Sequence, residues 1–400
     1  MTHWRSVVAM VSFAGISGLG TPSALAQASG APAPAKLKGF ALPTGEGTSF
    51  AITGNAQFRY AANLRDTDDV GDRDDFTHGF SNRRVRLGAQ GTVLDPNLSF
   101  RVDGELATAE RMELIDVFLA YRWEGGTRVR AGQFKVPLLQ EELNSHTRLQ
   151  TVERSIVNAV FTQNYSQGVE VSHAWESFRV AGAFSDGLNT INTDFDAARE
   201  ADWALTGRAE WKWAGEWPRL DQFTSWRGSE YAGFLGFAGH VQSGGETGAR
   251  TGGTNDVDVA QYTADLSIKG DGWNVFLAFV GRNTDSAAAA RSFDDFGLVA
   301  QGGLFVSEEA ELFLRYDHVF VDDDRATSPG VGGEDFASIT AGVTYYFSPR
   351  SHAFKVQAEV VYFPDSQADA GTLVRPSSST SVLASGEAQG LFRVQTQIVW

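Results

Sequence analysis

Basic side chains recur at alternate positions in several short segments of the chain. Arg84 and Arg86, and later Arg128 and Arg130, each lie two residues apart with an apolar residue between them. In an extended strand such residues share one face. A row of guanidinium groups binds anions through paired N–H donors and does not lose its charge. The predicted anion-binding, pore-lining residues are Arg84, Arg86, Arg101, Arg122, Arg128, Arg130 and Lys135.

Acidic residues on the same predicted faces allow a second interpretation. Asp103, Glu105 and Asp116 fall at positions that point to the same side as the arginines. Ion pairs between the two sets would brace the wall and set its field without binding a solute. The sequence leaves both interpretations open.

The elements that position these residues are strands. Alternation of polar and apolar residues with period two predicts β-strands. Sixteen such segments occur, at 51–64, 81–93, 98–107, 113–123, 127–134, 167–174, 178–185, 203–213, 231–242, 257–269, 273–283, 296–305, 310–320, 336–347, 353–363 and 389–400.

The connections between these strands differ in length in a regular way. Short turns such as 95–97 alternate with long polar connections such as 186–202. This pattern is typical of an all-β fold, a 16-stranded antiparallel transmembrane β-barrel, here expected over residues 49–400. One connection, 214–230, falls on the short-turn side despite its length, and the pattern does not explain it.

The last segment, LFRVQTQIVW, is an amphipathic strand that ends in Trp400. Strands in lipid cannot leave backbone groups unpaired, so this strand is expected to pair with the first one and close the barrel. An aromatic C-terminal residue on such a strand resembles the assembly signal of bacterial outer-membrane proteins. The expected surroundings are therefore the lipid and lipopolysaccharide of the cell outer membrane.

The longest informative connection runs from Gly132 to Gly168, well beyond a usual hairpin loop. We expect this third external loop to fold inward and narrow a pore. Opposed charges across such a constriction create a transverse field, although helical spacing around residues 149–157 also allows the charges to be structural. The predicted constriction-loop residues are Glu141, Glu142, Arg148, Glu153 and Arg154.

The N-terminus has the features of an export signal. Residues 1–26 contain a charged start, a short apolar run and a small-residue ending, which predict a signal peptide. Residues 27–48 are expected to be a flexible lead-in. The absence of cysteine excludes disulfides and thiolate chemistry, and a net charge of −16 argues against nucleic acid as a partner.

The sequence offers no catalytic or metal-binding constellation. His240 and Ser243 lie three residues apart on a predicted strand and therefore face opposite sides. No metal-ligand spacing, phosphate loop or dinucleotide motif occurs, so we expect no catalytic residue, no metal and no cofactor.

Four runs in order resemble the phosphate-selective porin O and P family. They are 83–88 (RRVRLG), 132–137 (GQFKVP), 152–155 (VERS) and 168–171 (GVEV), and the resemblance extends over residues 50–400. It implies a homotrimeric channel in a Gram-negative outer membrane, with an inward third loop. It also implies phosphate or polyphosphate binding by basic side chains, which carries over to Lys135 and less directly to the wall arginines.

The sequence departs from this family pattern in features that affect selectivity. It contains six lysines, and the first external loop, RDTDDVGDRDDF, is strongly acidic. We therefore expect passive diffusion of small hydrophilic solutes and ions, with a preference for anions. The alternatives are a phosphate- or polyphosphate-selective channel and, in another class, a non-conducting binding or structural barrel.

Overall fold

A computed structural model describes residues 40–42, 47–67, 74–106, 112–195, 197–244, 257–286, 291–326, 335–365, 373, 377, 380–383 and 385–400. The signal peptide predicted over residues 1–26 lies outside these residues, as does the predicted lead-in except for residues 40–42, 47 and 48. Within the described ranges, no helix has the length and apolar character needed to cross a membrane.

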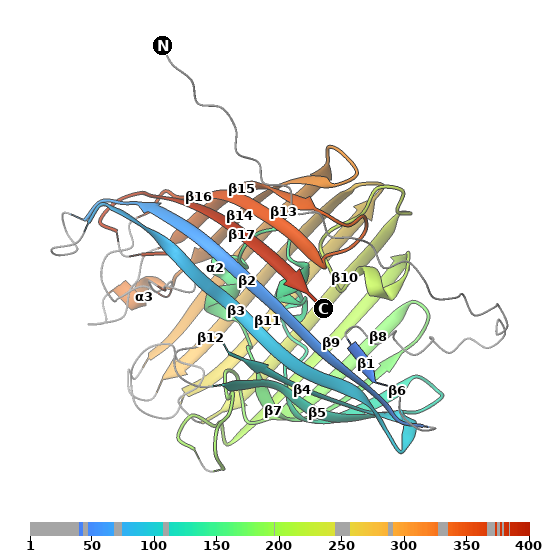
Figure 1. Ribbon diagram of the computed structural model, residues 1–400. Coiled ribbons are helices and arrows are strands. Elements are labelled where there is room, and N and C mark those ends of the chain that lie inside the picture. The colour runs from blue at the N-terminus through green and yellow to red at the C-terminus, as the bar shows by residue number, and fades with distance from the viewer. Residues whose placement is uncertain are drawn as a thin grey trace. The chain divides into compact units, whose positions relative to one another are not determined.

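Sixteen of the described strands form one continuous antiparallel sheet (Figure 1). Their bounds are β2 Ser49–Leu64, β3 Phe76–Val93, β4 Asp95–Glu105, β5 Glu113–Arg122, β6 Thr127–Phe134, β7 Ser166–Ala174, β8 Phe178–Ser185, β9 Trp203–Ala214, β10 Ala232–Ser243, β11 Val257–Gly270, β12 Trp273–Ser286, β13 Arg291–Phe305, β14 Ala310–Phe320, β15 Phe336–Tyr346, β16 Phe354–Phe363 and β17 Gln389–Val399.

The sheet closes on itself because the last strand pairs with the first barrel strand. In the β17–β2 ladder Phe392 is opposite Ala62 and Ile398 is opposite Ala56. Every other barrel strand pairs with its neighbours in the sequence, so the predicted 16-stranded antiparallel barrel is confirmed. A short strand that the sequence did not predict, β1 (Phe40–Leu42), also pairs with β2.

The barrel has an apolar outside and a polar inside, the reverse of a soluble protein. On β14, Leu312 and Leu314 are exposed while the alternating Glu311 and Arg315 are buried. Aromatic pairs lie at strand ends, for example Tyr121 with Trp123 and Trp211 with Trp213. This sorting follows from the cost of charge on the lipid face, about 2–4 kcal/mol for Arg or Lys near the membrane midplane.

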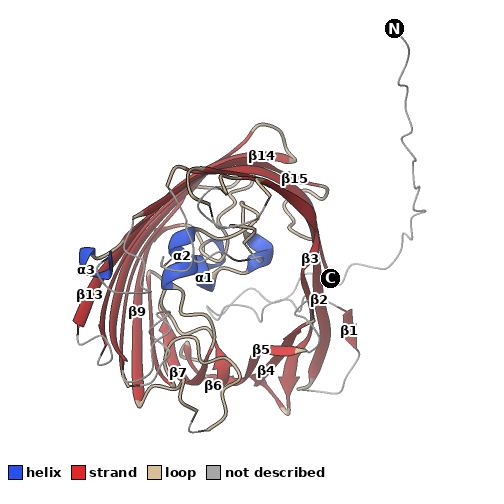
Figure 2. Ribbon diagram, turned by 90° about the vertical axis from the view of Figure 1, so that its left-hand side faces the viewer, coloured by secondary structure: helices blue, strands red, loops and turns tan. Residues whose placement is uncertain are grey.

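Residues 135–165, here called the inner loop, connect β6 to β7. They contain α1 (Gln140–Leu143), a 3-10 turn η1 (His146–Arg148) and α2 (Ile156–Phe161). Figure 2 shows α1 and α2 inside the ring of strands. On the far wall, Lys355 Nζ donates to Leu149 O at 2.6 Å. The main apolar cluster lies between the inner loop and strands β10–β17.

Specific small residues let the inner loop pack against the wall. The Ser155 side chain accepts a hydrogen bond from Asn158 N and caps α2. On β13, a Cβ atom added to Gly297 would lie 2.6 Å from Val157 Cγ1, so glycine leaves the space that this helix occupies. The helical spacing seen in the sequence therefore corresponds to a helix that begins only at Ile156.

The unexplained segment 214–230 also lies inside the barrel, reaching in from the short-turn side. It contains the 3-10 turn η2 (Trp217–Arg219), and Lys269 Nζ donates to Arg219 O at 2.6 Å. Gln140 of the inner loop donates to Leu220 O at 3.1 Å, so the two inserted segments touch. Trp226 packs edge-on against Tyr346 with ring centroids 4.7 Å apart. This segment is therefore a second insertion, which explains its length.

The remaining helix, α3 (Asp323–Ala326), lies between β14 and β15.

Candidate functional site

A cavity of about 1150 Å³ lies beside the inner loop on the short-turn side of the barrel. Strands β2–β6, the inner loop, and the short-turn residues 218–226 and 350–353 all contribute to its lining. Its lining contains seven basic residues against two acidic ones, Asp103 and Asp116. The basic residues of this cationic cavity are Arg86, Arg101, Arg128, Arg130, Lys135, Arg148 and Arg350. A low-dielectric wall of this sign raises the local concentration of anions.

Three arginines of the cationic cavity form ion pairs with carboxylates on the barrel wall. Arg86 Nε lies 2.7 Å from Glu105 Oε2, and Arg130 Nη2 lies 2.6 Å from Glu170 Oε2. Arg101 pairs with Asp103 and lies 3.7 Å from Asp116. For these three arginines the structure agrees with the second interpretation, in which ion pairs brace the wall. Their partners include Asp103, Glu105 and Asp116, the three acidic residues that the sequence indicated.

The other predicted arginines on this side have a different setting. Among the residues that the structure describes, no carboxylate forms an ion pair with Arg122, Arg128 or Arg148. The Arg128 guanidinium lies 5.6 Å from the centre of the Phe118 ring. Arg148 Nη1 donates to Asp221 O at 3.3 Å, and Arg122 is exposed and opposite Arg128 in the β5–β6 ladder. Arg128 and Arg148 both line the cavity, so among the predicted arginines these two present their charge to it without a paired carboxylate in the described part of the chain.

Lys135 lies where the wall meets the inner loop. Its Nζ is 2.5 Å from Glu142 Oε1 and donates to Glu142 O at 2.8 Å. It also lies 5.2 Å from the centre of the Tyr165 ring. Burial lowers the pKa of Lys135 to about 8, because the attraction of Glu142 offsets only part of the cost of burying the ammonium.

The inner-loop acids mainly hold the loop together. Glu141 accepts from both Ser155 N at 2.8 Å and Ser155 Oγ at 2.5 Å. Glu142 pairs with Arg154 at 3.3 Å as well as with Lys135. Burial alone would raise the pKa of Glu142, but these two cations outweigh it and lower the pKa to about 2. The structural interpretation of the loop charges therefore applies to these residues.

His146 adds no charge to the cavity near neutral pH. Burial, with nearby Arg86, holds its pKa well below the usual value. Arg86 Nη1 lies 3.2 Å from His146 Nδ1, and a guanidinium can only donate. The ring proton is therefore on Nε2, which donates to Asn55 Oδ1 at 3.0 Å.

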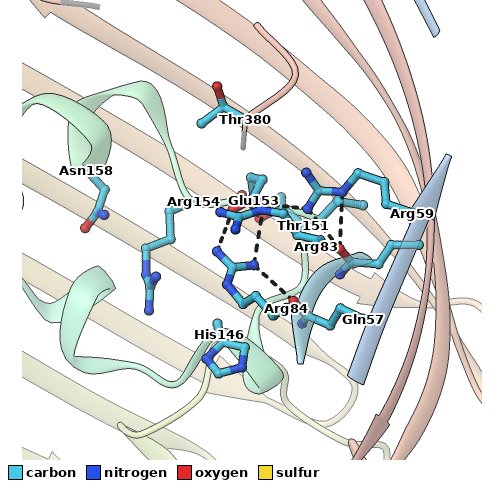
Figure 3. Close-up of polar contacts among 12 residues, drawn as sticks. Gln57, Arg59, Arg83, Arg84, His146, Thr151, Glu153, Arg154, Asn158 and Thr380 are labelled. Atoms are coloured by element: carbon cyan, nitrogen blue, oxygen red, sulfur yellow. Dashed lines mark hydrogen bonds and ion pairs between the residues drawn. The ribbon is translucent and has the colours of Figure 1, made fainter. Parts of the chain in front are cut away.

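Arg84 is not among the lining residues of the cationic cavity. It points toward Glu153 of the inner loop, where Arg59 and Arg83 also lie (Figure 3). Arg84 Nη2 is 3.0 Å from Glu153 Oε2, and Arg83 Nε is 2.5 Å from Glu153 Oε1. Arg59 pairs with the same carboxylate. The alternation in the sequence predicts Arg84 inside and gives no indication of Arg83. Arg59 is not among the predicted site residues, although its place between Phe58 and Tyr60 on the first predicted strand is a signal that could have found it.

The described residues contain no group of His, Cys, Asp or Glu that could hold a metal ion. The arrangement can act on solutes through its electrostatic field. Two inserted segments narrow a polar lumen, and cationic side chains lie on the part of the wall that these segments leave uncovered. A closed barrel with an apolar exterior and such a lumen defines the class of outer-membrane channels, the porins.

Comparison with known families gives the same class. The sequence model of the family "Phosphate-selective porin O and P" matches residues 50–211, so the family resemblance drawn from the motifs is confirmed over these residues. Among curated protein sequences, none matches this chain.

Solved structures of porins are similar in fold. The anion-selective porin from Comamonas acidovorans is 13% identical, with a TM-score of 0.60 over 88% of this chain and 100% of that one. OprB of Pseudomonas putida is 12% identical, with a TM-score of 0.57 over 88% and 94%. OmpT of Vibrio cholerae in its trimer form is 13% identical, with a TM-score of 0.54 over 89% and 100%. At these identities the likeness shows the fold.

Proposed function

We propose that this chain forms a water-filled channel in a Gram-negative outer membrane, through which small hydrophilic solutes and ions diffuse passively, with a preference for anions. The cationic cavity carries this proposal, because its seven basic and two acidic lining residues set the sign of the field beside the constriction. The channel needs no cofactor, since diffusion down a gradient requires only a wetted path and a selective field.

Phosphate or polyphosphate selectivity is the second candidate. The match of residues 50–211 to the family model favours it. The pairing of Arg86 with Glu105 and of Arg130 with Glu170 weakens it, because a solute phosphate must compete with these internal carboxylates. We therefore place general anion preference first.

The proposal includes export and assembly. Residues 1–26 serve as the signal peptide and are removed on export. The mature barrel assembles as a homotrimer, which is the form of one similar structure, OmpT of Vibrio cholerae. Cross-linking of the refolded protein in detergent tests the trimer, and a monomeric product alone contradicts it.

Planar-bilayer recording tests the channel itself. The refolded protein is added to a bilayer with a KCl gradient, and the reversal potential gives the ratio of chloride to potassium permeability. We expect stable current with a reversal potential displaced toward chloride. A cation-selective reversal potential contradicts the anion preference, and the absence of current would leave a non-conducting binding or structural barrel.

A further inference from the structure

An aromatic side chain, Phe118 of β5, lies on the lumen side of the barrel wall. It lines the cationic cavity together with Asp116, which precedes it by two residues on the same face of the strand. The next residue, Leu119, is exposed on the opposite face, toward lipid. The lumen of such a barrel is polar, and an apolar ring at the edge of a water-filled cavity costs free energy unless it has a partner. The alternation of the barrel strands therefore does not explain Phe118.

The surroundings of Phe118 are partly apolar and partly cationic. The residue packs against the main apolar cluster but remains partly exposed. The guanidinium groups of Arg128 and Arg130 each lie 5.6 Å from the centre of its ring, and Arg101 is opposite Phe118 in the β4–β5 ladder. Guanidinium groups are attracted to the faces of aromatic rings. Phe118 thus joins an apolar surface to three neighbouring cations.

The three arginines around Phe118 are not equally available to a solute. Arg130 Nη2 is 2.6 Å from Glu170 Oε2, and Arg101 also has a carboxylate partner. Arg128 forms no ion pair within the part of the chain that the structure describes. A carboxylate from a solute can therefore bind the N–H donors of Arg128 without displacing a carboxylate of the protein.

The cationic cavity offers further apolar surface away from the wall. Leu143 and Tyr165 of the inner loop and Trp226 of the second insertion all line it. Lys135 Nζ is 5.2 Å from the centre of the Tyr165 ring, so a cation and a ring are again neighbours. Small-molecule sites combine an apolar lining with a few polar or charged groups that fix orientation. An inorganic anion such as phosphate gains nothing from apolar surface, whereas an organic anion does.

We infer that Phe118 and Arg128 form a subsite for organic anions that carry a flat apolar group, of which the aromatic carboxylates are the simplest class. The carboxylate binds Arg128, and the ring lies against Phe118 in the offset or edge-on arrangement that aromatic pairs prefer. This inference rests on the proposed channel function and names the class of solute that the cationic cavity retains during passage. One ring and one guanidinium bind weakly, which suits a channel because a tightly held solute does not leave.

Block of the chloride current in planar bilayers tests the subsite. Benzoate and acetate carry the same carboxylate, and benzoate adds the aromatic ring. We expect benzoate to halve the chloride current at a concentration at least about fivefold lower than acetate, because contact with an aromatic ring adds this much affinity. Equal block by the two anions would overturn the inference while leaving the anion preference of the channel, measured by the reversal potential, intact.

Phe118→Thr removes the ring and keeps all seven basic residues of the cavity. Threonine suits a strand position that faces a polar lumen. We expect the difference between benzoate and acetate to fall below about twofold in a barrel that still prefers chloride to potassium. Phe118→Tyr keeps the ring and should keep the difference. A parental difference in Phe118→Thr would contradict the inference.

Phe134→Leu is the control for an indirect effect through the arginines. The Phe134 ring lies 4.0 Å from the Arg130 guanidinium, but Phe134 is fully buried and does not line the cavity. Leucine keeps most of the apolar volume that this buried position needs. We expect the benzoate preference to stay at its parental value. If Phe134→Leu loses as much of it as Phe118→Thr, the placement of the arginines sets the preference and the subsite is rejected.

A second readout does not require conduction. Benzoate should raise the unfolding temperature of the detergent-refolded parent barrel more than acetate does, because a ligand stabilises the state that binds it. Phe118→Thr should show no such difference, and an equal rise in both proteins contradicts the inference. A benzoate-specific rise in a barrel that never conducts supports the subsite and rejects the proposed channel, so the two failures are distinguishable.

Discussion

The two walls of the lumen use arginine in different ways. On the packed wall, Arg315 of β14 is 2.7 Å from Asp317 and donates to Thr151 and to Glu153 O of the inner loop. On the open wall, Arg128 of β6 faces the cationic cavity with an aromatic ring as its neighbour. The difference lies in whether the inner loop supplies acceptors. An arginine count alone therefore does not predict selectivity.

The largest effect should follow removal of the packed-wall arginine. Arg315→Leu leaves the buried carboxylate of Asp317 without its ion pair and removes one donor each from the carbonyl groups of Glu153 and Arg154. Breaking a buried pair in this way costs about 3–5 kcal/mol of unfolding free energy. Urea unfolding of the refolded barrel, followed by tryptophan fluorescence, measures the loss.

Arg128→Leu is the matched variant on the open wall. Because Arg128 lies toward a water-filled cavity without an ion pair among the described residues, its loss should change the unfolding free energy by less than about 1 kcal/mol. Equal destabilisation by the two variants would contradict the distinction between the walls.

The second effect concerns selectivity. Arg128→Glu replaces a positive charge at the cationic cavity by a negative one. A unit charge at about 4 Å in water contributes about 1 kcal/mol, so the chloride-to-potassium permeability ratio should fall by at least about fivefold. The reversal potential in a KCl gradient measures this ratio.

Arg122→Glu makes the same change of charge on the adjacent strand. Arg122 is opposite Arg128 in the ladder but is exposed. We expect a clearly smaller shift of the reversal potential. If Arg122→Glu matches Arg128→Glu, the field that selects ions is not set at the cationic cavity.

The same contrast separates what the sequence could predict from what it could not. Period-two alternation is local, so it predicted all sixteen barrel strands and the lumen side of Arg86 and Arg128. A β-bulge in the β2–β3 pairing, which leaves Arg83 without an opposite residue, interrupts that period and has no residue signature here. The partnership of Arg59 with Glu153 joins positions 94 residues apart, and only the folded loop brings them together.

The second inserted segment was missed for a related reason. Length alone marked 214–230 as unusual, but its direction depends on contacts such as Lys269 with Arg219 O and Trp226 with Tyr346. These contacts join segments that are distant in the sequence. Alternation describes one strand at a time and cannot report them.

The smallest predicted effect is a pH dependence that the arginines cannot produce. Lys135 lines the cationic cavity, and burial lowers its pKa from 10.5 to about 8. Between pH 7 and 9 the cavity loses most of this charge, while every arginine remains protonated. We expect the chloride-to-potassium permeability ratio to fall by less than about twofold over this range, since several cations remain.

Lys135→Arg separates this titration from other pH effects. The guanidinium does not titrate below pH 9, so the variant should show a permeability ratio independent of pH in this range, whereas an unchanged pH dependence would assign the titration to another group.

The lowered pKa of Lys135 also determines how this group changes stability with pH. Between about pH 8 and 10.5 the unfolded chain binds the Lys135 proton more tightly than the folded barrel does, so this group makes the unfolding free energy rise with pH. Alkaline pH should therefore weaken anion preference while the contribution of Lys135 to stability increases, a combination that loss of the fold cannot produce.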